Sequence, residues 1–194
     1  MELFYSPTSP YARKVRVLAR ELDLMSLIKE VKVVPSEKPE ALMARTPLAR
    51  VPMLTTKDGL TLPESSLIAR YLIKQHFPAA VPNWADLRYE ALCSGMLDMA
   101  ITVVMDRRRE NHQDDAWIAS RLANIQSTLA GIYEEWRESF PEKGLAVVSL
   151  ACALDYLSFR LPELEWEKHY PALADWLHEV LDCQFYRQTD PRKV

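Results

Sequence analysis

The first part of the chain contains short hydrophobic runs of the kind found in β-strands. Runs rich in aromatic or β-branched residues favour extended backbone. Four such runs occur, at residues 3–5, 31–34, 51–55 and 60–62. The last two flank Lys57-Asp58-Gly59, whose Asp-Gly pair is typical of a hairpin turn. These runs are the predicted strands of the first part of the chain.

Helical spacing alternates with these runs. Apolar residues recur at the i, i+3, i+4, i+7 positions of one helix face at Val15, Leu18, Ala19 and Leu22. A second helix is marked after Glu64 by apolar residues at positions 67, 68, 71 and 72. A weaker helical segment lies at Pro39–Ala44. The predicted order is therefore β-α-β, a short helix, and β-β-α.

From Trp84 onward the strand patterns stop and only helical spacing remains. The preceding segment, Phe77–Asn83, has two prolines and no periodicity, which is typical of a linker. Four helices are predicted after it, at residues 84–109, 118–136, 145–159 and 171–183. The third is nearly all apolar, so we expect it to be buried on most sides. We predict two domains, residues 1–77 and 85–194, joined by a linker at 78–84.

The composition is that of an ordinary globular protein. The chain has 194 residues, of which 48% are hydrophobic and 26% are charged, enough for one large domain or two small ones. The net charge of −3 gives no strong attraction to nucleic acid or to an anionic membrane. No apolar run approaches the roughly 18 residues that a membrane span needs. We therefore expect neither nucleic acid nor membrane as a partner.

The cysteines and histidines indicate no disulfide framework and no metal site. The three cysteines are far apart, and the four histidines lack ligand spacing. We expect the cysteines to be buried space-filling residues. The start of the chain, Met1–Tyr5, lacks the basic region and long apolar run of a signal peptide. The expected compartment is the cytoplasm.

The segment Ser6–Lys14 combines hydroxyls, prolines and positive charges. Pro10 suits the first position of a helix, which places Ser9 at the N-cap. Ser9 is then either a cap only, or a hydroxyl that also donates a hydrogen bond to a bound thiolate, since a helix N-terminus favours anions. Lowering a thiol pKa by one unit needs about 1.4 kcal/mol. One charge-assisted hydrogen bond supplies about 1.5–3 kcal/mol, so one donor and the helix dipole suffice.

Two further stretches carry candidate chemistry. In Thr46–Leu54, Pro52 stands at the start of a strand, where its missing N–H is tolerated if the peptide bond is cis and the backbone faces a ligand. In Leu62–Ile68, a carboxylate and two hydroxyls stand where a helix begins. Taken alone, Ser65 or Ser66 could be a simple N-cap.

In this order and spacing, the three stretches resemble the glutathione-binding half of a glutathione S-transferase. The family's strand motif has the form Asn-Pro-x-Gly-Lys-Val-Pro-x-Leu, from which Thr46, Ala49 and Arg50 depart. The segments Thr8–Lys14 and Phe185–Thr189 further resemble those of bacterial cytosolic, serine-type members. The resemblance runs over nearly the whole chain. It implies an α/β thioredoxin-like N-terminal domain followed by an all-helical C-terminal domain.

The resemblance also implies a role for each residue of the site. Ser9 would activate the glutathione sulfur. The alternative hydroxyls for this role are Thr8 and Ser6, followed by Tyr5, which is expected to be buried in the first strand. The remaining glutathione contacts would come from Arg50, Val51, Pro52, Glu64 and Ser65. Val51 would pair its backbone with the cysteinyl part, and Pro52 would hold the preceding bond cis. Glu64 would accept the γ-glutamyl ammonium and Ser65 the neighbouring carboxylate. Arg50 would pair with the glycyl carboxylate, unless it is a solvated edge charge.

The second substrate would lie against the long helix after the linker. Met96, Met99, Ala100 and Val103 share one helix face, and Met99 and Val103 are the candidate pocket residues. The same stripe fits a core or a dimer interface. The cations Arg13 and Lys14, and the run 107–109, are expected to be solvated. Ala49 replaces a glycine of the family motif, which matters only if its φ is positive.

The resemblance implies a cytoplasmic, homodimeric glutathione transferase-like enzyme. Glutathione would be its co-substrate, a small electrophile or disulfide its second substrate, and neither a metal nor another cofactor would be needed. Two other functions fit the same fold: a non-catalytic protein-binding regulator and a glutathione-dependent disulfide reductase. The fold alone does not distinguish them.

Overall fold

The computed structural model describes residues 1–109 and 115–193, which form two compact units. The first unit contains Met1–Pro82 together with Cys183–Val194, and the second contains Asn83–Asp182. The end of the chain thus belongs to the N-terminal unit, whereas the sequence placed the whole of 85–194 in the helical domain. The difference arises because the last short helix packs on the first helix of the chain.

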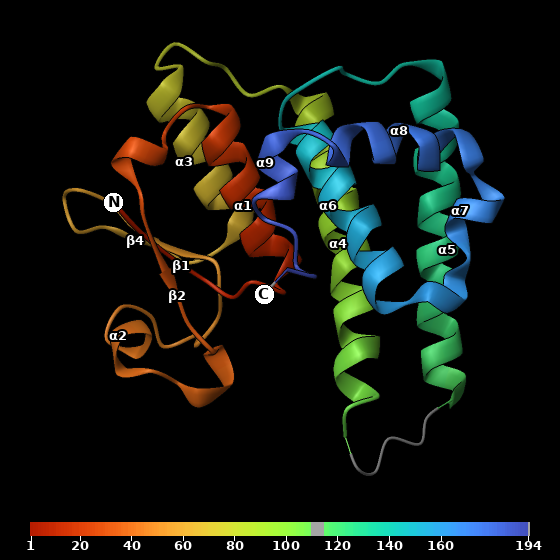
Figure 1. The fold of residues 1–194 in the computed structure, drawn as a ribbon, viewed down its shortest axis with the longest axis horizontal. Coiled ribbons are helices and arrows are strands. Elements are labelled where there is room, and N and C mark those ends of the chain that lie inside the picture. Colours follow the sequence, from red (N-terminus) through yellow and green to blue (C-terminus); the bar gives the residue numbers. More distant parts are fainter. Residues whose placement is uncertain (110–114, 194) are drawn as a thin grey trace. The chain divides into compact units, whose positions relative to one another are not determined.

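The first unit is built on a four-stranded mixed sheet with the strand order β2-β1-β3-β4 (Figure 1). The strands are β1 (Glu2–Tyr5), β2 (Lys29–Lys32), β3 (Met53–Thr55) and β4 (Thr61–Leu62). β1 runs parallel to β2 and antiparallel to β3, and β3 runs antiparallel to β4. The second strand was predicted at residues 31–34 and lies two residues earlier. Its bounds are set by pairing with β1 and not by the positions of its valines.

The helices of the first unit are α1 (Pro10–Glu21), α2 (Glu40–Met43), α3 (Ser65–His76) and α9 (Gln184–Arg187). The first three lie where the sequence predicted helices, whereas α9 was not predicted. The apolar faces of α1 and α3 are buried, as the spacing predicted. In β1, Leu3 and Phe4 point to opposite faces of the sheet and both are buried. Phe4 packs against Leu42 of α2 and Met53 of β3, so α2 covers one of these faces.

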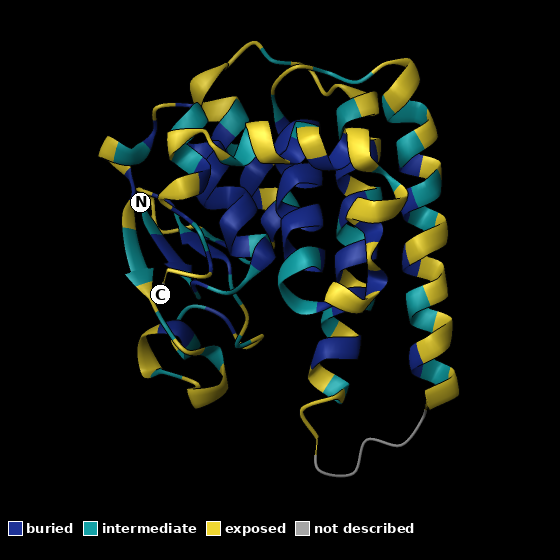
Figure 2. Cartoon of the chain, turned by 45° about the vertical axis from the view of Figure 1, so that its right-hand side comes forward, coloured by how far each residue is buried: buried dark blue, intermediate teal, exposed yellow. Residues whose placement is uncertain are grey.

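The second unit is entirely helical in its described residues. Its helices are α4 (Trp84–Asp106), α5 (Asp115–Glu138), α6 (Leu145–Arg160), α7 (Trp166–His169) and α8 (Pro171–Leu181). α6 packs against α4 and α8, and every residue from Leu145 to Leu157 is buried (Figure 2). This confirms the prediction of a helix buried on most sides, and it explains why α6 carries almost no polar face.

No single described helix is long and apolar enough to cross a membrane. The bent pair formed by α6 and residues Pro162–His169 meets the length and composition criteria alone.

Three expectations about single side chains were wrong. Arg13 and Lys14 are only 4% and 2% exposed, although they were expected at the surface of α1. Arg13 is covered because α9 and the residues after it lie against this part of α1. Cys183 is exposed, whereas Cys93 and Cys152 are buried as expected. The spacing of α1 marked its apolar face but could not show that a distant segment covers its polar side.

Candidate functional site

Ser9 occupies the N-cap of α1. Its φ and ψ are −79° and 118°, and its Oγ accepts a hydrogen bond from the Ala12 N–H at 3.2 Å. Pro10 follows at the first helical position. A serine hydroxyl has one donor in addition to its acceptor lone pairs. Ser9 can therefore cap the helix and still donate its proton to an anion, so its two interpretations are compatible.

The helix register separates Ser9 from Thr8. α1 begins at Pro10 with Ser9 as its cap, and Thr8 lies one residue outside the helix. Both side chains are half-buried. Because the exposed N–H groups and the partial positive charge belong to the first turn, Ser9 is the hydroxyl that the helix end directly supports. Which of the two contacts sulfur stays a prediction.

The Val51–Pro52 peptide bond is cis, as predicted. Val51 precedes β3, and its side chain packs against the cluster of Phe4, Leu42 and Met53. Within the described part of the chain, neither its N–H nor its C=O has a backbone partner. A ligand with a peptide backbone could therefore pair with Val51 as an added strand would.

The loop before Val51 has an unusual backbone. Ala49 has φ +49°, in the left-handed region where glycine is favoured. The sequence left open whether the alanine in place of the family's glycine matters. Because φ is positive at this position, it does. Arg50, next to it, is exposed. Exposure of the Arg50 guanidinium fits both alternatives, contact with an anionic ligand and a solvated charge.

Glu64 is the N-cap of α3, whereas the alternative that the sequence left open was an N-cap at Ser65 or Ser66. Its carboxylate accepts hydrogen bonds from the N–H groups of Ser66 and Leu67, at 2.7 and 3.0 Å. The Ser65 hydroxyl donates to it at 3.1 Å, and Ser65 is 3% exposed. These three bonds fix the carboxylate, and a carboxylate offers about four lone-pair sites. Glu64 can accept one further donor, such as an ammonium group.

The sheet topology brings the three segments to one edge. β1 ends at Tyr5, shortly before Ser9, and Phe4 pairs with Met53 at the start of antiparallel β3. Leu62, at the end of β4, pairs with Leu54 of β3. The end of β1, the start of β3 and the end of β4 therefore share one edge of the sheet. Ser9 follows the end of β1, the cis bond precedes the start of β3, and Glu64 follows the end of β4, so all three lie at this edge.

The two candidate residues for the second substrate differ in burial. Val103 is fully buried and Met99 is half-buried. Both lie in α4, which packs against α5 and α6. The burial of Val103 favours the core alternative for that residue, whereas Met99 keeps some exposed surface. Their contact with a second substrate stays a prediction.

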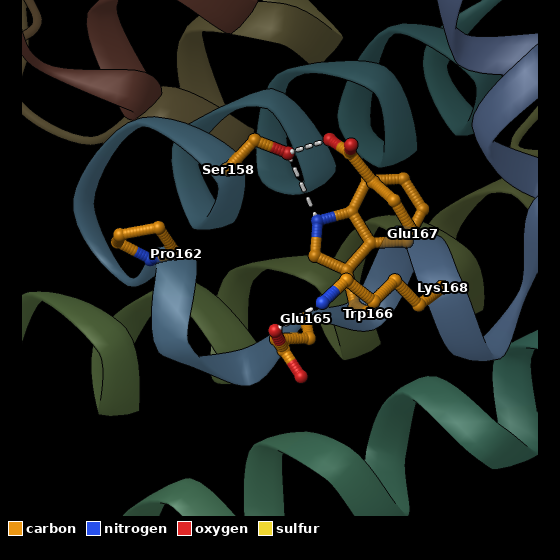
Figure 3. A pocket seen from close by; sticks show the side chains of 6 residues that line it. All are labelled: Ser158, Pro162, Glu165, Trp166, Glu167 and Lys168. Carbon is orange, nitrogen blue, oxygen red and sulfur yellow. Dashed lines mark hydrogen bonds and ion pairs between the residues drawn. The ribbon is translucent and has the colours of Figure 1, made fainter.

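A small surface pocket of about 180 Å³ lies where α6 passes into α7 (Figure 3). In it the Ser158 hydroxyl accepts from Trp166 Nε1 at 3.0 Å and donates to Glu167 at 2.6 Å. Its volume is below the roughly 300 Å³ from which small-molecule sites begin. The polar groups are satisfied by one another, so we assign the pocket no ligand. The described residues hold no group of three metal-ligating side chains placed to share an ion.

Comparisons with known proteins define the family. A family model described as "Glutathione S-transferase, N-terminal domain" matches residues 3–80. A glutathione transferase family member from Pseudomonas fluorescens Pf-5, solved with bound glutathione, is 31% identical, with a TM-score of 0.83 and 97% of each chain covered. A glutathione S-transferase from Methylobacillus flagellatus KT, also with glutathione bound, is 33% identical, with a TM-score of 0.81 over 97% of this chain and 98% of that one.

A curated relative from Escherichia coli K12, an uncharacterized GST-like protein called YibF, is 27% identical over the full length of both chains. Taken with the solved structures, these matches show that the chain belongs to the glutathione S-transferase family. The thioredoxin-like N-terminal domain and the helical C-terminal region expected from the sequence are confirmed.

Proposed function

We propose that this protein binds glutathione at the shared sheet edge and ionises its thiol for attack on a small electrophile. The observation that carries the proposal is the convergence of Ser9, the cis Val51–Pro52 bond and Glu64 at that edge. Relatives 31% and 33% identical bind glutathione in their solved structures, which supports the same ligand here.

In this proposal Ser9 stabilises the thiolate. Its Oγ–H donates to the sulfur while its lone pair keeps the Ala12 N–H, and the positive end of α1 adds to the preference for the anion. A thiol pKa lowered by two units needs about 2.7 kcal/mol, within reach of these two contributions. Serine cannot form a mixed disulfide, so the site favours transfer of the thiolate to an electrophile over cysteine-based redox exchange.

The remaining groups would hold the tripeptide. Val51 has a free N–H and C=O for the cysteinyl part, and Glu64 has an unused acceptor site for the γ-glutamyl ammonium. The Ser65 N–H is the first of α3, and no acceptor for it occurs among the described residues. It can bind the γ-glutamyl carboxylate. Arg50 would meet the glycyl carboxylate as a surface ion pair, which contributes little.

We further propose that the second substrate is a small electrophile and that the protein acts as a cytoplasmic homodimer. A family member from Pseudomonas fluorescens, 30% identical, was solved with bound S-(propanoic acid)-glutathione. That ligand carries its substituent on the glutathione sulfur, which is the position that a conjugation reaction fills. This supports conjugation over disulfide reduction.

The proposal is tested by calorimetric titration of glutathione into the wild type and into Glu64→Gln and Ser9→Ala. The bound thiolate is followed in parallel by its ultraviolet absorbance against pH. We expect Glu64→Gln to weaken binding about tenfold or more, because it loses a charge-assisted bond. Ser9→Ala should keep binding but lose most of the lowering of the thiol pKa.

Thr8→Val is the matched control, because it removes the hydroxyl of the neighbouring residue, which lies outside the helix. A thiol pKa that rises in Thr8→Val and not in Ser9→Ala would transfer the role to Thr8. No binding by the wild type at millimolar glutathione would contradict the enzyme proposal and favour a non-catalytic role.

A further inference from the structure

The segment between α2 and β3 carries the backbone that is proposed to pair with glutathione (Figure 1). Its start is fixed to the core of the first unit. The N–H groups of Arg45 and Thr46 both donate to the C=O of Leu42, at 3.0 and 3.1 Å. Leu42 is fully buried in the hydrophobic core of this unit. Thr46 therefore has a defined position before the chain continues to Val51.

Thr46 differs from its neighbours in burial. Of residues 44–50, all of which the structure describes, Thr46 alone is buried, with 3% of its surface exposed. Pro47, Leu48 and Arg50 are exposed. A buried hydroxyl costs free energy unless it makes a hydrogen bond. The burial of Thr46 therefore calls for a hydrogen-bond partner close to its side chain.

That partner is the loop itself. The Thr46 Oγ1 accepts the N–H of Leu48 at 3.3 Å. Within residues 47–51, no other backbone N–H or C=O has a hydrogen-bond partner in the described part of the chain. The next backbone pairing is that of β3, which begins at Met53. The hydroxyl of Thr46 thus supplies the one hydrogen bond that holds residues 47–51 among the described residues.

The loop needs such a hold because Ala49 has a positive φ. Its φ of +49° lies in the left-handed region, which disfavours residues with a Cβ. A conformation of this kind persists only where the surrounding structure maintains it. The bond from Thr46 reaches Leu48, the residue before Ala49, and Val51 follows two residues after Ala49. The bond therefore fixes the backbone that leads to Val51.

We propose that Thr46 is a positioning residue for glutathione, whose hydroxyl holds the loop so that the free N–H and C=O of Val51 can pair with the tripeptide. The inference rests on the proposed function and deepens it, because Thr46 itself has no glutathione contact assigned. Groups held in their bound conformation raise affinity, since less conformational entropy is lost on binding. Loss of the bond weakens glutathione binding and leaves Ser9, which acts on the thiol, unchanged.

The test compares Thr46→Val and Thr46→Ser with the wild type, by calorimetric titration of glutathione and by ultraviolet titration of the bound thiol. Valine keeps the shape of threonine without the hydroxyl, whereas serine keeps the hydroxyl. We expect Thr46→Val to weaken binding about fivefold and Thr46→Ser to bind within about twofold of the wild type. The pKa of the bound thiol should be the same in all three proteins, because Ser9 is intact.

Thr56→Val is the matched control, because Thr56 is a second buried threonine whose hydroxyl holds a turn. Thr56 is 4% exposed, and its Oγ1 accepts the N–H of Leu60 at 3.0 Å, beyond the other end of β3. This variant should lose stability in urea and still bind glutathione within about twofold of the wild type. If it weakens binding as much as Thr46→Val, a general loss of stability lowers the affinity and the inference is refuted.

A second variant removes the same bond from the donor side. Replacing Leu48 with its α-hydroxy acid turns the N–H into an ester oxygen and leaves Thr46 in place, and Leu48 is 55% exposed. The ester protein should bind as weakly as Thr46→Val, and it decides the matter if Thr46→Val fails to fold. Wild-type affinity in these variants would overturn this inference alone. No binding by the wild type at millimolar glutathione would overturn the proposed function as well.

Discussion

At the scale of single residues, Ala49 has a backbone conformation that favours glycine. Its φ of +49° costs a residue with a Cβ about 1–2 kcal/mol. We predict that Ala49→Gly raises the free energy of unfolding by about 0.5–1 kcal/mol, after the greater freedom of glycine in the unfolded chain is subtracted. Urea unfolding measures the change.

The matched control for this prediction is Ala123→Gly. Ala123 is exposed in the middle of α5, where glycine should lower stability by about 1 kcal/mol. Equal losses in the two variants would show that Ala49 is not strained.

Glu21, at the end of α1, makes stability depend on pH. Burial raises its pKa to about 7 from 4.5. Between these values the native state holds a proton that the unfolded chain has released, so stability falls as pH rises from about 4.5 to 7. We predict that Glu21→Gln raises the free energy of unfolding at pH 8, because it removes a charge that burial disfavours. We expect a gain of about 1–3 kcal/mol, less than the whole pKa shift corresponds to, because the side chain is partly exposed.

The same variant should match the wild type near pH 4, where both side chains are neutral. Glu138→Gln, at an exposed position in the last turn of α5, serves as the control and should change little at either pH. A stability difference for Glu21→Gln that does not vary with pH would contradict the raised pKa.

At the scale of elements, α1 is held from two sides. On one side Arg16 and Arg20 bond Glu30, which belongs to β2, at 2.7 and 3.0 Å. On the other side Arg13 donates to the hydroxyl of Thr189 at 3.4 Å, and Thr189 is 2% exposed. α1, which carries Ser9 at its N-cap, is thus held in place by β2 and by the end of the chain.

We predict that Thr189→Val lowers the free energy of unfolding by about 1–3 kcal/mol, because a buried arginine loses one acceptor while the shape is kept. Thr189→Ser retains the hydroxyl and should recover most of the loss. Both are measured by urea unfolding. Equal stability of the valine variant and the wild type would show that this contact does not hold α1.

At the scale of the whole molecule, the division into units makes the last residues part of the N-terminal unit. Tyr186 and Thr189 are each 2% exposed within it. We predict that a chain ending at Asp182 loses about 3 kcal/mol or more, mostly from the exposed surface that Tyr186 covered. Limited proteolysis should then cut first within residues 1–82. First cuts within 83–182 would instead support the domain boundary expected from the sequence.

The sequence by itself determined the elements whose signals are local. Helical spacing located α1, α3 and α6, because burial of one face repeats every three to four residues. Pro10 and Ser9 marked a helix start, because proline fixes φ at a helical value and lacks the N–H that a first turn leaves unpaired. The cis bond before Pro52 was implied by the family resemblance. The family resemblance then supplied the fold and the candidate glutathione residues.

Only the tertiary structure decided what depends on distant segments. The register of β2, the burial of Arg13 by α9, and the left-handed backbone at Ala49 have no signal in their own neighbourhoods. Glu64 is the cap of α3 because the helix begins at Ser65, so the Glu64 carboxylate lies one residue before the first turn and accepts the N–H groups of Ser66 and Leu67.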